Sequence, residues 1–231
     1  MGNHEFDSVS GTGGDEPYAI FNGNNAAGNL TFPAITGANG VATYDFTYSY
    51  ELAPGWLLVV LNTSVNFNTQ TAASQATNLG NWIDTWRAAN GGHGCVIVAL
   101  HTARWSTTFS GSADNGPNWV TGITPVWDAA IAHHVDIWLQ GHVHAYEEFE
   151  KLDDQGNVSS AGIKTFTVGA GGRGQVAGGW SNIDVSKRLD YRASAVNGIL
   201  KLALYDGSFG YKFEQAGSAT TPTSSITCNV P

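Results

Sequence analysis

Short apolar runs alternate with amphipathic segments through the middle of the chain, and this alternation limits the fold more than any other feature of the sequence. Apolar residues fill three short runs, and they recur at every third or fourth position in two longer segments between them; in chain order these are 56–61, 69–89, 95–100, 119–134 and 135–139. Runs of that length are typical of buried strands, and the longer period is typical of helices. The middle of the chain therefore predicts strand, helix, strand, helix, strand.

The flanking segments add strands without adding helices. Aromatic and polar residues alternate over 44–50, and Pro54-Gly55 then leads into the run 56–61, which predicts an antiparallel strand pair. Further strands are expected over 164–168, 198–204 and 209–214. Residues 2–40 are dense in Gly, Asn and Asp and predict mainly loops, and Pro125 is expected to kink or split the second helix. We predict the α/β class, with a β-sandwich of mixed sheets flanked by helices.

Composition supports one domain. The chain has 231 residues, of which 42% are hydrophobic, and this is enough apolar material for one sizeable core. We assign that domain to residues 1–215 and expect the Ser/Thr-rich tail, 216–231, to lie extended over the surface or to fray. The net charge of -9 disfavours double-stranded nucleic acid as a partner, and no apolar run is long enough to cross a membrane.

The two cysteines, Cys95 and Cys228, leave two alternatives open. A disulfide would tie the tail to the core, whereas an inert buried thiol needs no partner. The start of the chain has neither the basic nor the apolar stretch of a signal peptide, although 29 Gly, 8 Trp and few Lys are typical of extracytoplasmic proteins.

Three polar clusters stand where buried strands end or where a Gly-rich loop begins: residues 2–5, His101 and residues 141–147. In open α/β sheets, sites assemble in the loops beyond the carboxyl ends of the strands. His142 and His144 alternate on a segment that we take as extended, so both are expected to face one metal cluster. The histidines outside these clusters lack this context: His93, His133 and His134.

Together these clusters resemble the motifs of the calcineurin-like metallophosphoesterases, and among them the purple acid phosphatase branch. The G-N-H-[DE] motif stands at 2–5, the strand-then-His motif at 95–101 and the G-H-x-H-x-Y-E motif at 141–147. Residues 44–62 look like the family's strand pair ending in L-N-T, and 168–174 look like its Gly-rich turn. The resemblance covers essentially the whole chain.

The resemblance implies hydrolysis of small phosphate esters, by a phosphatase or phosphodiesterase, at a site with one or two ions of Fe, Zn or Mn. By position, Asn3, His101 and His142 would bind one metal ion, His144 would bind the other, and His4 would act as general acid. The resemblance also implies a secreted or periplasmic protein.

Aromatic residues are the candidates for substrate contact. Trp105 and Phe109 lie in a loop rich in Gly, Ser and Thr and are expected to line the mouth of the site, and Tyr146 belongs to the last motif. Trp127, on the second helix, is expected in the core.

The chain departs from the family in its carboxylates. The D-x-H and G-D motifs, which supply two of them and a histidine, are absent before Asn3. Neutral ligands leave the charge of a metal ion uncompensated, so weak affinity is expected unless Asp7, Asp15, Glu16 or another carboxylate moves in. Two smaller departures are Ala103 in place of a proline and Glu148 in place of an arginine.

The missing motifs lie on central strands of the family, so a second chain, strand exchange or re-pairing is expected to cover the gap. A chain cut from a longer secreted enzyme is equally consistent. A weakly active or inactive remnant that binds one metal ion is the second hypothesis. A third is hydrolysis of another substrate, such as a glycoside, by carboxylates near the motifs; such clusters are more often solvated surface. These are Asp15, Glu16, Glu147, Glu148 and Glu150.

Overall fold

The computed structural model describes residues 47–63, 72–106, 122–171, 189–193, 196–217 and 225–229. Asn3, His4, Phe109, Asp7, Asp15 and Glu16 lie outside these ranges. The loops expected over 2–40 lie outside them as well.

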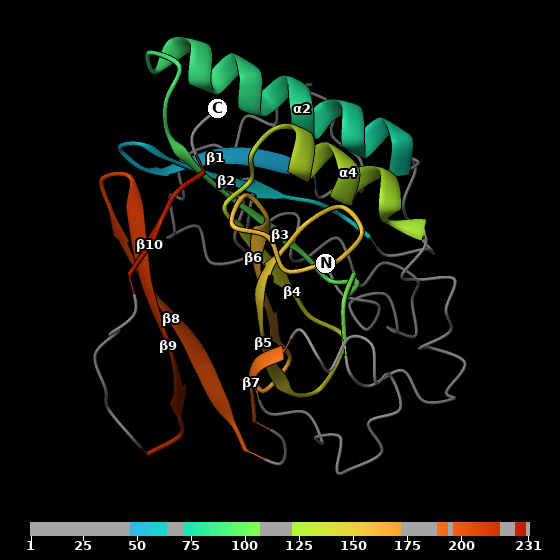
Figure 1. Ribbon diagram of the computed structural model, residues 1–231, viewed down its shortest axis with the longest axis vertical. Helices are drawn as coiled ribbons and strands as arrows, with labels where there is room; N and C mark the ends of the chain where they lie inside the picture. Colours follow the sequence, from blue (N-terminus) through green and yellow to red (C-terminus); the bar gives the residue numbers. More distant parts are fainter. Residues whose placement is uncertain are drawn as a thin grey trace, which may run out of the picture.

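A seven-stranded mixed sheet forms the middle layer, in the order β1-β2-β3-β4-β6-β5-β7 (Figure 1). Its strands are β1 (Tyr48–Ala53), β2 (Trp56–Val60), β3 (Cys95–Leu100), β4 (Ile137–Gln140), β5 (Tyr146–Leu152), β6 (Ile163–Val168) and β7 (Leu189–Ala193). The four strands β2, β3, β4 and β6 run parallel, while β1, β5 and β7 each run antiparallel to their neighbours. The prediction of a mixed α/β fold is confirmed, and so is the strand pair β1–β2.

Helices cover one face of this sheet. They are α2 (Ala72–Ala89) and α4 (Thr124–Ala132), which lie side by side in Figure 1. Trp82 and Ile83 of α2 and Trp127 of α4 are buried against sheet residues in one core cluster. Pro125 lies in the first turn of α4, where its missing N–H has no helical partner to lose. Gly122 is helical and Ile123 forms a turn, so the segment is interrupted just before this proline.

The carbonyls at the end of α4 are satisfied by a buried arginine of α2. Arg87 donates to the carbonyl oxygens of His133 at 2.6 Å, His134 at 3.1 Å and Gly94 at 3.1 Å. Burial lowers the pKa of this guanidinium from its usual value, although Asp136 opposes the effect. One side chain thus fastens both helices to the loop before β3.

A second, three-stranded sheet covers the opposite face, in the order β10-β9-β8. It consists of β8 (Gly198–Tyr205), β9 (Ser208–Gln215) and β10 (Ile226–Thr227). Phe209 of β9 packs edge-to-face on Trp56 of β2, and the indole N–H of Trp56 donates to the carbonyl oxygen of Tyr205 at 2.8 Å. These contacts give the sandwich its second core.

The tail segment 225–229 is anchored to the core, and the expectation for the tail as a whole stays a prediction. Cys228 forms a disulfide with Cys95 of β3, so of the two alternatives for these cysteines the structure has the bridge. The side-chain amide of Asn229 donates to the carbonyl oxygens of Val135 at 3.0 Å and Gly162 at 3.1 Å. Its backbone N–H donates to the buried carboxylate of Asp136.

Three strands were not predicted: β5, β7 and β10. In β5 the sequence places charged residues on both faces, which hides the strand period. As for membranes, the described helices include none with the length and apolar character that a bilayer crossing needs.

Candidate metal site at the ends of the parallel strands

The carboxyl ends of the parallel strands meet at one edge of the sheet, as the sequence predicts for His101 and His142. Hydrogen bonds join the segments that follow these strands. Thr102, after β3, donates its N–H to the hydroxyl of Thr63, after β2, at 2.9 Å. Gly141, after β4, donates its N–H to the carbonyl oxygen of His101 at 3.0 Å. Hydrogen bonds therefore connect the loops that follow β2, β3 and β4 at this edge of the sheet.

The structure brings His101 and His142 into direct contact. Nε2 of His101 lies 3.0 Å from Nδ1 of His142, and the two rings stand at 80° to each other. Both residues are half-buried. Gly141 packs against His101, since a Cβ there would lie 3.4 Å from Nδ1 of that residue.

The backbone at His142 is in the left-handed region, with φ of 65°. The N–H of Val143 donates to the carbonyl oxygen of Gly141 at 2.8 Å, which is the hydrogen bond of a γ-turn centred on His142. Positive φ is rare for a residue with a side chain and costs about 1 kcal/mol or more. The turn also corrects the assumption that the H-x-H segment is extended, because β4 ends at Gln140 and β5 begins at Tyr146.

A glycine packs directly against this turn. The N–H of Gly169, after β6, donates to the carbonyl oxygen of Ala145 at 3.0 Å, and a Cβ at Gly169 would lie 1.7 Å from the carbonyl oxygen of Val143. No side chain fits at that distance. The loop that carries His142 and His144 is thus held against the end of β6.

A buried polar network, which sequence reasoning missed, lies beside the histidine loop. The amide of Gln140 donates to the hydroxyl of Thr167 at 2.8 Å, and that hydroxyl donates to Oε2 of Glu147 at 3.1 Å. Gln140 also accepts from the N–H of Arg104 at 2.8 Å and donates to the carbonyl oxygen of Trp105. Polar threonines inside the apolar run of β6 were the available signal.

Glu147 is fully buried, which corrects its expected place on a solvated surface. Its neighbour Glu148 extends to the other face of β5, because consecutive strand residues alternate. There Glu148 accepts from Lys164 at 3.1 Å and from the hydroxyl of Tyr211 at 2.6 Å. Burial, with the hydrogen bond to Glu148, raises the pKa of Tyr211 to about 12.

Of the three aromatic candidates for substrate contact, the two within the described ranges lie inside the protein. Trp105 is 8% exposed and packs edge-to-face on Trp127, with ring centres 5.9 Å apart. Tyr146 is fully buried and stacks on Phe213 with ring centres 4.2 Å apart. Burial raises the pKa of Tyr146, and its hydroxyl donates to Glu148 at 3.3 Å. Both rings are packed in the interior, whereas residues that line the mouth of a site would be exposed. Substrate contact by Trp105 and Tyr146 therefore stays a prediction.

His144 lies in the same loop and is half-buried. It does not form a group with His101 and His142 in which all ligand atoms lie within 4.8 Å of one another. Within the described ranges, no third His, Cys or carboxylate ligand atom lies within 4.8 Å of both His101 and His142. The described group that does meet this spacing is Cys95, Asp136 and Cys228, whose sulfur atoms are already bonded to each other. Of the remaining histidines, His133 bonds Asp84 of α2 at 2.9 Å.

Comparison with models of protein families finds no match, and comparison with curated proteins finds none either. Among solved structures, the purple acid phosphatase PPD1 from yellow lupin (Lupinus luteus) seeds aligns with a TM-score of 0.60 at 15% identity. The alignment covers 88% of this chain and 36% of that one. The fold is similar to that of a purple acid phosphatase.

Two further structures align less closely. PhoD aligns with a TM-score of 0.47 at 12% identity, covering 78% of this chain and 41% of that one. GAP50, the anchor in the inner membrane complex of Plasmodium, aligns with a TM-score of 0.46 at 14% identity, covering 81% and 54%. This chain therefore spans only about a third of the length of the phosphatase, about two fifths of PhoD and about half of GAP50.

Proposed function

We propose that this chain hydrolyses small phosphate esters with the help of a transition metal bound at His101 and His142. The observation that carries the proposal is the 3.0 Å contact between Nε2 of His101 and Nδ1 of His142 at the ends of adjacent parallel strands. The fold similarity to a purple acid phosphatase supports the same choice of reaction.

The donor atoms of this pair fit a metal ion. Imidazole nitrogens bind zinc at 2.0–2.1 Å, so two nitrogens on one ion lie roughly 3.0–3.4 Å apart. The observed separation falls at the short end of that range. Imidazole suits zinc and iron well, whereas magnesium and calcium prefer oxygen ligands.

The proposed ligands are Asn3, His101, His142 and His144, with His4 as general acid. A bound metal would supply Lewis acidity and a hydroxide near neutral pH. His4 would hold the proton that the leaving alkoxide takes up. The γ-turn fixes the backbone that carries the imidazole of His142. Among the described residues, this turn is what positions a proposed metal ligand.

The same geometry favours a second function, the binding of one metal ion without turnover. The described residues place no carboxylate with the histidine pair, and neutral ligands leave the charge of the ion uncompensated. Glycoside hydrolysis receives less support. Glu147 and Glu148 lie on opposite faces of β5, so they cannot flank one bond together.

We further propose that residues 1–215 form the catalytic domain, that 216–231 form its tail and that the protein is secreted or periplasmic. The disulfide supports this location, because disulfides persist in oxidising compartments. The proposed partners are a phosphate-ester substrate and a second copy, or an exchanged strand, at an edge of the sheet. Neither a membrane nor double-stranded nucleic acid is proposed as a partner.

The test combines elemental analysis of the purified chain with hydrolysis of p-nitrophenyl phosphate, with and without added Mn, Fe or Zn. We expect about one metal ion per chain and turnover that His142→Ala lowers by at least about 100-fold. His93→Ala is the matched control, because His93 lies in an exposed loop before β3. It should leave both readouts unchanged.

Each other outcome is decisive. Metal bound at His142 without turnover supports the non-catalytic alternative and rejects hydrolysis. Turnover that survives His142→Ala, or a chain that takes up neither metal nor substrate, overturns the proposal.

A further inference from the structure

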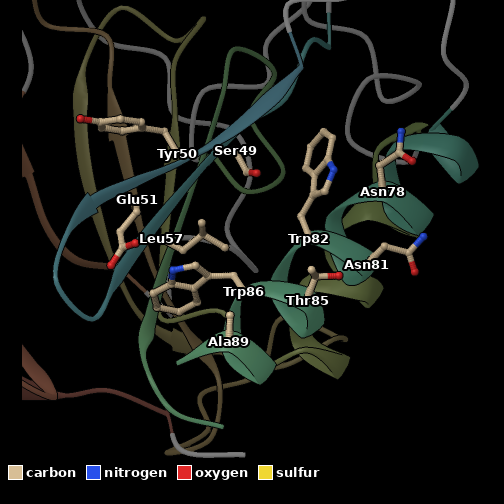
Figure 2. A pocket seen from close by; sticks show the side chains of 10 residues that line it. All are labelled: Ser49, Tyr50, Glu51, Leu57, Asn78, Asn81, Trp82, Thr85, Trp86 and Ala89. Carbon is tan, nitrogen blue, oxygen red and sulfur yellow. The ribbon is translucent and has the colours of Figure 1, made fainter. Parts of the chain in front are cut away.

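A groove of about 520 Å³ lies between the strand β1 and the helix α2 (Figure 2). It shares no residue with the candidate metal site. β1 is the last strand on its side of the described sheet, so the groove opens beside an edge strand. Its volume is that of a pocket for a small organic ligand.

One stripe of α2 forms most of the lining. Asn78, Asn81, Trp82, Thr85 and Trp86 follow one another at alternating intervals of three residues and one residue and therefore lie on one side of the helix. Figure 2 shows the rings of Trp82 and Trp86 projecting from α2 into the space beside β1. Trp82 is largely buried in the core and Trp86 is half-buried, so the groove combines mainly the ring of Trp86 with amide and hydroxyl groups.

We propose that this groove binds a neutral oligosaccharide. A sugar presents weakly polarised C–H groups on its ring faces, and these pack well on aromatic faces, whose quadrupole is negative. Its hydroxyls donate and accept hydrogen bonds, as do the amide of Asn81 and the hydroxyls of Thr85 and Ser49. The groove is therefore lined both by aromatic surface and by groups that donate and accept hydrogen bonds.

The charge of the lining disfavours anionic ligands. Of the described residues that line the groove, Glu51 is the only charged one. A phosphate or a uronate would meet a carboxylate and no cation here. The groove is therefore not a second site for the phosphate esters of the proposed function, and this inference does not depend on that function.

A buried donor in the groove also has no acceptor. The indole N–H of Trp86 is buried without a hydrogen-bond partner in the described structure, although buried polar groups are nearly always paired. Figure 2 shows this nitrogen on the side of the ring that faces Leu57. A ligand hydroxyl drawn between α2 and β1 would supply the acceptor.

An extended peptide added to β1 is the competing occupant. It would bind through the backbone of β1 and would need few of the helix side chains. The observed lining argues for the sugar, because the polar groups of Asn81 and Thr85 belong to α2. Substitution of these side chains separates the two cases.

The test titrates the full chain with four neutral tetrasaccharides: cellotetraose, laminaritetraose, mannotetraose and maltotetraose. Calorimetry and tryptophan fluorescence report binding. We expect at least one of them to bind with a Kd of roughly 10 μM to 1 mM, a range typical of a small pocket without ionic contacts. Tetragalacturonate, which has the same length but carries carboxylates, should bind at least about tenfold more weakly.

Three variants test the contacts, with a fourth as matched control. Asn81→Ala, Thr85→Ala and Trp86→Phe should each raise the Kd about threefold to tenfold, the effect of one lost hydrogen bond. Thr77→Ala should leave it unchanged, because Thr77 is exposed on the same helix and bonds only the carbonyl oxygen of Ala73 at 3.0 Å. Hydrolysis of p-nitrophenyl phosphate should not change in any of them.

Several results overturn the proposal. These are no binding of any neutral tetrasaccharide up to about 10 mM, equal binding of tetragalacturonate, and a loss with Thr77→Ala as large as that with Thr85→Ala. Tight binding of an extended peptide that is indifferent to Asn81→Ala assigns the groove to a peptide and also rejects the sugar.

Discussion

At the scale of single residues, His142 combines an unusual backbone with a specific contact. Its φ of 65° is held by the γ-turn hydrogen bond from Val143 to Gly141, and its ring meets His101. Strain of this kind persists only where the surroundings enforce it, and it is often found at functional sites. Substitutions that remove the imidazole but differ in their tolerance of positive φ separate the effect of the backbone strain from that of the ring contact.

The backbone strain predicts an order of stability among variants without the imidazole. His142→Gly should be more stable than His142→Ala by about 1 kcal/mol, because only glycine adopts positive φ without steric cost. Urea unfolding of both variants measures the difference. The same pair at His134, where φ is 51°, should show a similar difference while leaving metal content unchanged. Equal stability of the two His142 variants would contradict the left-handed turn.

A second residue-scale prediction concerns Asp136, which is almost fully buried beside the disulfide. Burial raises the pKa of its carboxyl to about 6, although hydrogen bonds from Val96 and Asn229 oppose the shift. The folded state therefore binds more protons than the unfolded state between about pH 4 and 6. This residue's contribution to the free energy of unfolding should fall by about 3 kcal/mol across that window as pH rises.

The measurement is a carboxyl carbon NMR titration, together with urea unfolding between pH 4 and 7. Asp136→Asn should remove this part of the pH dependence. Asp154→Asn, at an exposed loop position, should retain it. A pKa for Asp136 near 4 would refute the expected coupling.

At the scale of elements, the loop between β4 and β5 depends on how closely β6 approaches it. Gly169, just after β6, leaves no room for a Cβ beside the carbonyl oxygen of Val143. The loop that carries His142 and His144 therefore has its position set by a backbone contact. That contact should be sensitive to a single methyl group.

Gly169→Ala should destabilise the fold by about 2 kcal/mol or more and displace the histidine loop, because backbone rather than a flexible side chain stands in the way. Gly171→Ala is the matched control, since a Cβ there meets nothing within 4 Å. Thermal unfolding and metal content measure the two effects. Similar losses in both variants would mean that the close approach of Gly169 is not the cause.

The elements also show what the sequence could predict. The apolar runs at β2 and β3 locate these strands well, because strands buried on both faces contain few polar residues. β5 escaped prediction since Glu147 and Glu148 are accommodated on opposite faces by Thr167 and Lys164, partners far away in the chain. Parallel topology predicts that His101 and His142 meet, whereas the γ-turn depends on contacts with the end of β6 that no local pattern encodes.

At the scale of the whole molecule, the disulfide connects the two layers of the sandwich. It links Cys95 at the start of β3 with Cys228, just after β10, across 133 residues of sequence. Closing so long a loop restricts the unfolded chain strongly in the chain-entropy model. The tail thereby becomes part of the stability of the domain.

Replacing both cysteines, Cys95→Ala with Cys228→Ala, should lower the free energy of unfolding by about 3 to 5 kcal/mol. Urea unfolding with and without reductant measures this. Reductant should lower the stability of the unmodified protein by a similar amount and should not affect the double variant. If reductant that has access to the unfolded chain leaves the free energy of unfolding of the unmodified protein unchanged, the bridge is contradicted.

The bridge also makes a covalent ring of the chain from Cys95 to Cys228, which contains every described strand after β2. A protease that cuts one peptide bond anywhere inside this ring leaves the two fragments joined. On a denaturing gel such a nicked molecule would migrate close to intact protein until its disulfide is reduced, and then separate into two bands. A cut in a loop between Cys95 and Cys228 would thus stay hidden in an oxidising environment and become visible on transfer to a reducing one.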